Sequence, residues 1–289
     1  MTSVPLHYTV DGPADAPVLV LGPSLGTTTE LWSPQMSALA EGFRVVRYDH
    51  RGHGRSPVPP GPHAIADLGR DVLALLDHLE VPRAYLGGVS LGGMVAMWVA
   101  AHAPERVDRL ALMCTAARLG PAEMWAQRAA SVRAEGIAAI ADAVLARWVP
   151  PEFGQRNPEI MADLRDMLTG TPAEGYAACC TAIETMDLEP DLRRITASTL
   201  VIAGLSDEAT PPSHAQRIAA LIPGARLVLV AGAAHLANVS RPDLIAELLI
   251  DFLSDRPIVP FPRHEGSDRD GSDRDSSDRE GSDREGLES

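Results

Sequence analysis

A serine in a glycine-rich segment is the residue whose surroundings most clearly predict chemistry. Residues 88–92 read Gly-Val-Ser-Leu-Gly, the G-x-S-x-G pattern, between an expected strand at 84–87 and an apolar, helix-like run at 94–101. A sharp strand-to-helix turn excludes bulky neighbours, and the two glycines of the pattern meet that need. The N-terminus of the following helix also favours negative charge that develops beside the serine. We therefore interpret Ser90 as the nucleophile of an acyl transfer.

A serine hydroxyl is a weak nucleophile and needs a base. On strand-to-helix elbows of this kind the partners follow in the chain order Ser, acid, His. His235 follows the last expected strand, at 226–230, and Asp207 follows the strand before it, at 199–203. We expect Asp207 to hold the imidazole of His235 in one tautomer and to stabilise its protonated form.

Other acidic side chains fit the acid position less well than Asp207 does. Glu208 is adjacent to it but is expected to point elsewhere on an extended turn. Asp187 and Asp191 fall in the helical stretch discussed below, away from a strand end.

Acyl transfer also needs N–H donors for the oxyanion that forms. The backbone N–H of Leu91, directly after the serine, is one expected donor. The second is expected from the loop at 22–27, which follows the strand at 18–21. Aligned on the commoner His-Gly-x form of this loop, Leu25 takes the donor position, although Pro23-Ser24 stands where that form has His-Gly.

The segment 49–56, Asp-His-Arg-Gly-His-Gly-Arg-Ser, also attracts a chemical interpretation. Two histidines beside an aspartate are compatible with a metal site. The glycines favour a tight structural loop instead, and the D-x-R-G-x-G-x-S pattern is a common structural signature. We therefore expect no metal and no other cofactor.

Short apolar runs that alternate with segments of helical period predict the elements that carry these residues. This alternation is typical of an α/β fold with a mostly parallel sheet and helices on both faces. Helices are expected at 65–79, 91–101, 213–221 and 244–253. The expected strands lie at 6–10, 18–21, 44–48, 84–87, 110–113, 199–203 and 226–230.

The alternation stops between 116 and 195, where helix-like segments follow one another with prolines between them. We interpret 116–195 as a helical cap inserted into a core made of 1–115 and 196–256. Such a cap would cover the C-terminal edge of the sheet, where open α/β sheets bind ligands.

Composition limits the remaining possibilities. A formal net charge of −14 argues against nucleic acid as a partner. The most apolar stretch, 86–101, is too short to span a bilayer, and residues 1–12 lack the pattern of a signal peptide. Three cysteines, two of them adjacent, favour a reducing cytoplasm. Residues 257–289 begin with prolines and continue as charged Ser-Asp-Arg repeats without a core, so we expect them to be disordered.

With these motifs placed, the chain resembles the 3-oxoadipate enol-lactonases, serine hydrolases with the α/β-hydrolase fold from the β-ketoadipate pathway. The likeness extends from 6 to 253, and its most discriminating piece is Gly-Tyr-Ala-Ala-Cys-Cys at 175–180. The matching segments are 24–28, 47–49 with 51–54, 90–94, 104–107, 175–180, 207 with 210–212, and 233–238.

The resemblance implies that water opens the enol-lactone of 3-oxoadipate, either through an acyl-enzyme or by direct attack. Because this substrate carries a carboxylate, the cap should supply a cation. Its candidates are Arg128, Arg133 and Arg147, with Trp125 and Trp148 as the apolar wall, and we select Arg133 and Trp148. Some members are fused to a carboxymuconolactone decarboxylase, and the charged tail resembles the start of such a linker. The resemblance thus implies fusion or association with that enzyme as a partner.

Three alternatives remain open at this stage. A general carboxylesterase and a cofactor-free perhydrolase, similar to the bromoperoxidases, share the triad and differ in the cap. A receptor with this fold that binds a small lactone also keeps a triad in some cases. A dehalogenase is disfavoured because the elbow carries Ser90 in place of an aspartate.

Overall fold

Seven strands form one sheet in the computed structural model, which describes residues 3–255. Their spatial order is β1-β3-β2-β4-β5-β6-β7, with β1 antiparallel to β3 and the other neighbours parallel. The bounds are β1 Tyr8–Asp11, β2 Val18–Gly22, β3 Arg44–Tyr48, β4 Ala84–Val89, β5 Val107–Met113, β6 Ser198–Gly204 and β7 Arg226–Val230. All seven expected strands are confirmed, with ends that differ by a few residues.

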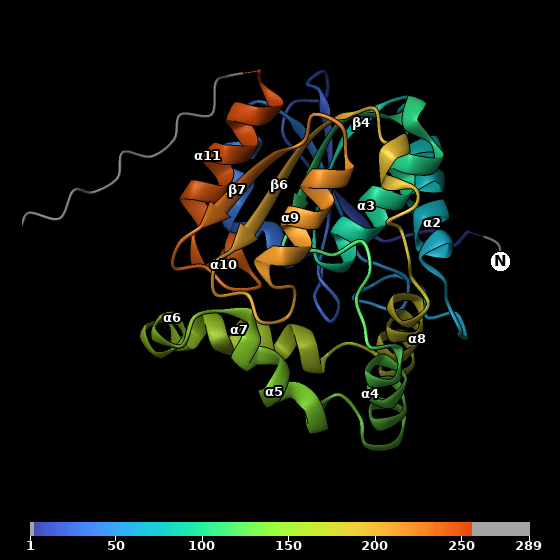
Figure 1. The fold of residues 1–289 in the computed structure, drawn as a ribbon, viewed down its shortest axis with the longest axis vertical. Coiled ribbons are helices and arrows are strands. Elements are labelled where there is room, and N and C mark those ends of the chain that lie inside the picture. Colours follow the sequence, from blue (N-terminus) through green and yellow to red (C-terminus); the bar gives the residue numbers. More distant parts are fainter. Residues whose placement is uncertain (1–2, 256–289) are drawn as a thin grey trace, which may run out of the picture. The chain divides into compact units, whose positions relative to one another are not determined.

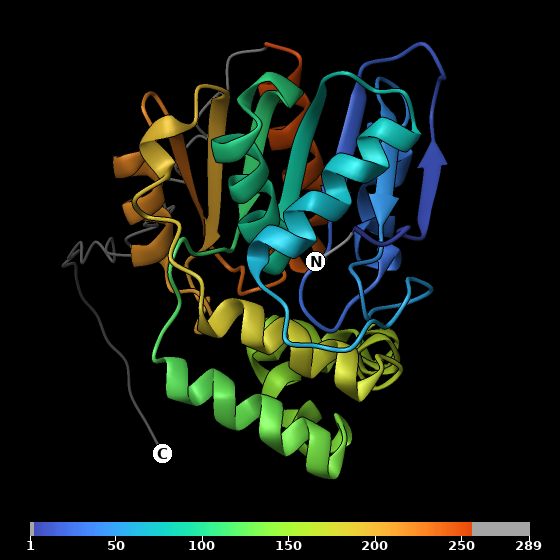
Figure 2. The same ribbon diagram turned by 90° about the vertical axis from the view of Figure 1, so that its right-hand side faces the viewer.

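Helices cover both faces of this sheet. On one face lie α2 (Ile65–His78), α3 (Leu91–His102) and α9 (Pro212–Leu221), as Figures 1 and 2 show. On the other lie α1 (Met36–Leu39) and α11 (Pro242–Leu253). Because both faces are covered, the central strands are apolar along their length, and β2 is buried at all but its first residue. The expected α/β-hydrolase fold, with helices on both faces of a mostly parallel sheet, is therefore confirmed.

Five helices lie between β5 and β6 and face the end of the sheet where the parallel strands finish (Figure 1). They are α4 (Ala122–Glu135), α5 (Ala138–Trp148), α6 (Pro151–Arg156), α7 (Pro158–Thr169) and α8 (Ala173–Glu184), and together they are called the cap below. Pro151 and Pro158 occupy the first turns of α6 and α7, where proline removes no helical hydrogen bond. In the cap, α4 and α8 pack along each other, and α8 also contacts α2.

Several short helices were not expected from the sequence, and two of them contact each other. The 3₁₀ helix η1 (Thr29–Gln35) and α10 (Ala237–Ser240) are held together by non-local hydrogen bonds. Gln35 Nε2 donates to the carbonyl of Asn238 at 2.7 Å, and Asn238 Nδ2 donates to the carbonyl of Leu31 at 2.8 Å. Such long-range partners leave no periodic pattern in the sequence. Two more 3₁₀ turns, η2 (Pro104–Arg106) and η3 (Leu192–Arg194), complete the elements of residues 3–255.

Two further expectations concern membrane-spanning helices and the C-terminal tail. Among residues 3–255, no helix combines the length and the apolar character that crossing a membrane requires. The expected disordered tail, 257–289, lies outside the described residues.

Candidate active site

Ser90 occupies a strained turn between β4 and α3. Its φ of 55° and ψ of −114° lie in a region that residues other than glycine rarely adopt. The turn is fixed from β5, because Ser90 N–H donates to Met113 and the Thr115 hydroxyl donates to the Ser90 carbonyl, at 2.9 and 2.7 Å. A Cβ on Gly88 would overlap the backbone of Gly92, and a Cβ on Gly92 would overlap the backbone of Gly22, which explains the two glycines of the pattern. The local geometry is that of a nucleophile elbow.

Asp207 and His235, from the loops after β6 and β7, are in contact. His235 Nδ1 lies 3.0 Å from Asp207 Oδ2 and 3.2 Å from Oδ1, so the ring donates its Nδ1 proton to this carboxylate. Both side chains are buried. Burial acts to raise the pKa of Asp207, but His235 and the hydrogen bonds from His235 and Thr210 outweigh it and lower this pKa. Asp207 is therefore an ionised partner that leaves Nε2 of His235 free.

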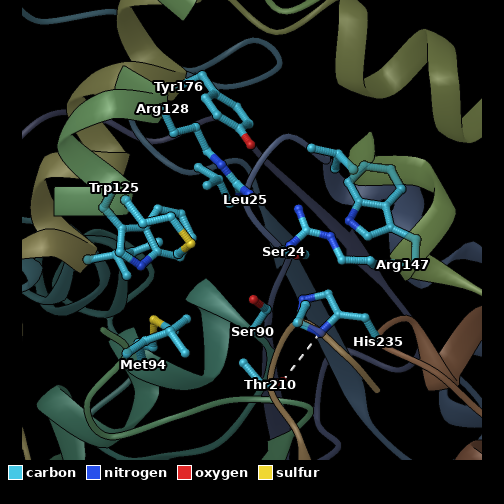
Figure 3. A pocket seen from close by; sticks show the side chains of 16 residues that line it. Ser24, Leu25, Ser90, Met94, Trp125, Arg128, Arg147, Tyr176, Thr210 and His235 are labelled. Carbon is cyan, nitrogen blue, oxygen red and sulfur yellow. Dashed lines mark hydrogen bonds between the residues drawn. The ribbon is translucent and has the colours of Figure 1, made fainter. Parts of the chain in front are cut away.

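Ser90 and His235 line the same pocket, with the hydroxyl and the ring beside each other in Figure 3. Within residues 3–255, no hydrogen bond joins the Ser90 hydroxyl to His235. In ligand-free enzymes this bond is often long and tightens only with bound substrate. The structure thus brings a serine hydroxyl, an imidazole and the carboxylate that orients it together in the chain order that the sequence predicts, and their catalytic roles stay predictions.

The two backbone groups expected to bind an oxyanion are the N–H groups of Leu25 and Leu91. Neither Leu25 N–H nor Leu91 N–H donates a hydrogen bond within the described part of the chain. Leu25 and Ser90 line the same pocket, and Leu91 is the first residue of α3. Two unpaired N–H groups near a nucleophilic serine are what a tetrahedral intermediate requires.

A cavity of about 50 Å³ lies between the cap and the ends of the strands. Trp148 lines it, as expected, and its carbonyl accepts a 2.7 Å hydrogen bond from Leu236 N–H, next to His235. The residues that line the cavity are Ser24, Leu25, Ser90, Met94, Leu119, Met124, Trp125, Arg128, Val144, Arg147, Trp148, Tyr176, Ile183, Ala209, Thr210 and His235. A cavity of this size favours a compact ligand.

Arg133, the cation selected from the sequence, does not line this cavity. It forms an ion pair with Glu174 at 2.8 Å on the surface of the cap, where its side chain is 41% exposed. The physical reason is helical spacing. Trp125 and Arg128, three residues apart on α4, share the face toward the pocket, whereas Arg133 is turned by about 140° from Arg128. The sequence signal that could have identified Arg128 is its spacing of three residues from Trp125, which places both side chains on one face of the helix.

Arg128 and Arg147 point into the pocket from α4 and α5 (Figure 3). Neither forms an ion pair with an acidic side chain of residues 3–255. Arg128 stacks over the Trp125 ring at 4.8 Å, and Tyr176 lines the same pocket. Burial and the nearby charge of Arg128 lower the pKa of Arg147. Two cations without a carboxylate partner in a small pocket form an environment that favours an anionic ligand.

Comparison with known proteins agrees with this geometry. Residues 17–158 match the alpha/beta hydrolase fold family. 3-Oxoadipate enol-lactonase 2 of Acinetobacter baylyi is 41% identical over 239 residues, which are 83% of this chain and 89% of that protein. The crystal structure of the enol-lactonase from Burkholderia xenovorans LB400 superposes with a TM-score of 0.85 at 44% identity, over 86% of this chain and 96% of that one.

A thermophilic esterase from Thermogutta terrifontis, in a malate-bound structure, is more distant. It superposes with a TM-score of 0.82 at 28% identity, over 86% of this chain and 93% of that one. The chain is therefore a hydrolase that belongs to the α/β-hydrolase family and, within it, to the family of the 3-oxoadipate enol-lactonases.

Proposed function

We propose that this chain hydrolyses the enol-lactone of 3-oxoadipate to 3-oxoadipate, with Ser90 as nucleophile, His235 as base and Asp207 as its orienting acid. The observation that carries the proposal is the pair Arg128 and Arg147, which face the pocket of Ser90 without acidic partners among residues 3–255. A small lactone with one carboxylate fits that environment, because a carboxylate removed from water needs a cation or hydrogen-bond donors.

The acylation step uses groups that already face the pocket. His235 Nε2 takes the proton of the Ser90 hydroxyl while the oxygen attacks the ring carbonyl carbon. The N–H groups of Leu25 and Leu91 stabilise the resulting oxyanion. When the ring C–O bond breaks, the leaving enol oxygen receives the proton from His235, and the enol becomes a ketone. The leaving group stays attached to the acyl chain, so the acyl-enzyme holds the whole substrate skeleton.

Deacylation repeats the same chemistry with water. His235 removes a proton from a water molecule that attacks the acyl carbon, and the proton then returns to the oxygen of Ser90. Asp207 stabilises the imidazolium form of His235 in both steps. The product acid ionises, so each turnover releases one proton and a dicarboxylate.

For the carboxylate of the substrate we propose Arg128 as the principal partner. Its guanidinium is stacked on the Trp125 ring, so little side-chain freedom is lost on binding. Arg147, whose Nε donates to the carbonyl of Ala143 on its own helix, adds a second positive charge.

The test compares two lactones that differ only in the charged group. One is the enol-lactone of 3-oxoadipate, and the other is 5-methyl-2(3H)-furanone, the same ring with a methyl in place of the carboxymethyl group. We expect kcat/KM to be at least about tenfold higher for the charged lactone. A tenfold difference requires that the transition state of the charged lactone be bound about 1.4 kcal/mol more strongly. One charge-assisted hydrogen bond supplies about 1.5–3 kcal/mol.

Other outcomes of this test would favour the alternatives. Equal rates on both lactones, together with fast hydrolysis of simple aryl esters, would favour a general carboxylesterase. Peracid formation from acetate and hydrogen peroxide at a higher rate than ester hydrolysis would favour a perhydrolase. A single slow turnover with a large rise in Tm would favour a lactone receptor.

A further inference from the structure

The loop 49–56, which the proposed mechanism does not use, contacts the loop that carries the expected oxyanion donor. Gly26 N–H donates to His53 Nε2 at 3.0 Å. His50 Nε2 lies 2.9 Å from the carbonyl of Pro23. The two contacts flank Leu25, one on each side along the chain. Both histidines therefore act on the segment that presents Leu25 N–H to the pocket.

The partners fix the proton on each ring. Because Gly26 N–H is a donor, His53 Nε2 must accept, and its proton sits on Nδ1, which faces the carbonyl of Arg51 at 3.2 Å. Because a carbonyl only accepts, His50 Nε2 must carry the proton toward Pro23. Both side chains are almost completely buried. Burial lowers the pKa of His50 to about 3 and that of His53 to about 4, so both rings are neutral near pH 7.

Loop 49–56 is itself anchored in the core. Arg51 donates two hydrogen bonds to the buried carboxylate of Asp71, at 2.6 and 2.7 Å. Asp49 accepts from the N–H groups of Thr29 and Arg55, at 2.8 and 2.9 Å. A histidine on such a loop has little freedom to follow a displaced neighbour. It can therefore fix the position of the loop that it contacts.

The same loop contacts the cap through the segment 175–180. A Cβ on Gly52 or on Gly175 would overlap the backbone of the other residue, so α8 and this loop meet backbone to backbone. Cys179 Sγ lies 3.7 Å from the carbonyl of Arg51. The Gly-Tyr-Ala-Ala-Cys-Cys run thus supplies a contact to the loop that holds His53, and Tyr176 faces the pocket.

These contacts support a structural role for the two histidines. Nε2 of each ring already has a protein partner, and within residues 3–255 no three His, Cys, Asp or Glu side chains are grouped to hold a metal ion. His50 and His53 are placed to orient the backbone.

We propose that His53 is a positioning residue of the oxyanion hole, which holds Leu25 N–H in place by accepting the hydrogen bond of Gly26 N–H. The proposal rests on the serine mechanism proposed above, but not on the identity of the lactone. His53 does not line the pocket of Ser90. Its effect should therefore appear in the stabilisation of the transition state and not in the binding of the substrate.

The experiment uses two polar variants that separate the two ring nitrogens. In His53→Gln the amide reaches the position of Nε2, and its oxygen can accept from Gly26 N–H. In His53→Asn the shorter amide reaches only the position of Nδ1, and it can donate to Arg51 while Gly26 N–H stays unpaired. The matched controls are His78→Gln and His78→Asn, on an exposed histidine of α2.

We expect His53→Gln to keep kcat within about threefold of the wild type. We expect His53→Asn to lower kcat by about 10–100-fold and to change KM by less than about threefold. This loss is smaller than the loss on complete removal of an oxyanion donor, because Leu25 N–H is displaced but still present. Binding of a trifluoromethyl ketone, which forms an oxyanion with the serine, should weaken in parallel with kcat/KM. Equal kcat for the two variants, or a loss carried by KM alone, would overturn the proposal.

Two additions keep this test decisive. All variants are assayed with 4-nitrophenyl acetate as well as with the enol-lactone. The variants can then be compared by their ester hydrolysis even if the enol-lactone is not the substrate. Folding is checked by circular dichroism, and His53→Met serves as a second variant that removes the acceptor. If neither His53→Asn nor His53→Met folds, His53 supports the whole core and the positioning role is wrong.

Discussion

Thr210 holds the carboxylate of Asp207 with two hydrogen bonds, from its N–H to Oδ1 at 2.9 Å and from its hydroxyl to Oδ2 at 2.8 Å. The same hydroxyl lies 3.3 Å from His235 Nδ1. Ala209 N–H adds a further bond to Oδ1 at 2.8 Å. Asp207 thus faces His235 with its orientation already set by its own loop, and the lowered pKa of this carboxyl has a structural cause.

The first prediction concerns the hydroxyl of Thr210. Thr210→Val keeps the shape and the backbone bond but leaves Asp207 Oδ2 with one donor fewer. We expect kcat to fall by about 3–10-fold, since one such bond is worth about 1 kcal/mol. Thr210→Ser should restore most of the loss, and Asp207→Asn should cost about 10⁴. Wild-type kcat in Thr210→Val, measured with saturating substrate, would contradict this role.

The second prediction concerns Ser90. Ser90→Ala removes the nucleophile from a turn whose backbone is held by Met113 and Thr115, so we expect the fold and Tm to be retained. We expect kcat to fall by about 10⁴–10⁶. Mass spectrometry of the wild type quenched during turnover of 4-nitrophenyl acetate should show an acetyl group on Ser90. Turnover by a folded Ser90→Ala variant without such a loss would favour direct attack by water.

The strands and the triad order could be predicted because their signals are local. Each strand is a short apolar run bounded by turn residues, and parallel strands bring their C-terminal loops to one edge. Asp207 and His235 each follow such a strand, and the contact between them is present in the structure. The catalytic role of Asp207 is a prediction that Asp207→Asn tests, and that of His235 stays a prediction.

The contacts that the sequence did not predict depend on packing between distant segments. Arg133 and Arg128 both stand on α4, and the sequence does not show which face of this helix packs toward the pocket and which lies at the surface of the cap. The bond from Gly26 to His53 joins two loops that are 27 residues apart, and neither loop has a periodic pattern. The glycines of loop 49–56 indicated a structural loop, but the sequence did not show which segment this loop supports.

The third prediction follows from the corrected position of the cation. Arg128→Gln should lower kcat/KM for the enol-lactone of 3-oxoadipate by about tenfold or more, and should leave the rate on 5-methyl-2(3H)-furanone nearly unchanged, because only the first carries a charge. The control is Arg133→Gln, on the same helix but paired with Glu174 at the surface. It should leave both rates unchanged. A larger effect of Arg133→Gln than of Arg128→Gln would show that the sequence-based choice was right.

The last prediction concerns the stability of the fold between pH 7 and pH 5. Burial lowers the pKa of His53 to about 4 and that of His50 to about 3, against 6.5 for a free histidine. As the pH falls below 6.5, the two histidines bind protons in the unfolded chain but stay neutral in the folded chain. Stability is therefore fully present above pH 6.5 and is lost progressively as the pH falls toward these lowered values.

Neighbouring charges do not change the sign. Burial lowers the pKa of His53, and the nearby His63 adds to this effect. The hydrogen bond to the carbonyl of Arg51 and the charge of Asp49 act to raise this pKa, but burial outweighs them. The lowered pKa of Asp207 affects stability in a different pH range. The stability that this carboxylate contributes is lost only as the pH falls below the ordinary aspartate pKa of 3.8. Between pH 7 and pH 5, the buried histidines should therefore dominate the change among these groups.

At pH 5 the unfolded chain lies 1.5 pH units below the free histidine value, which corresponds to about 2 kcal/mol for each buried ring. We expect the free energy of unfolding, measured with urea, to fall by at least about 2 kcal/mol between pH 7 and pH 5. His53→Gln cannot be protonated, so in this variant the fall should be smaller by about 1–2 kcal/mol. The exposed His78→Gln control should show the wild-type fall. An identical fall in His53→Gln and in the wild type would mean that His53 is already protonated at pH 5, which is incompatible with a ring that accepts the N–H of Gly26.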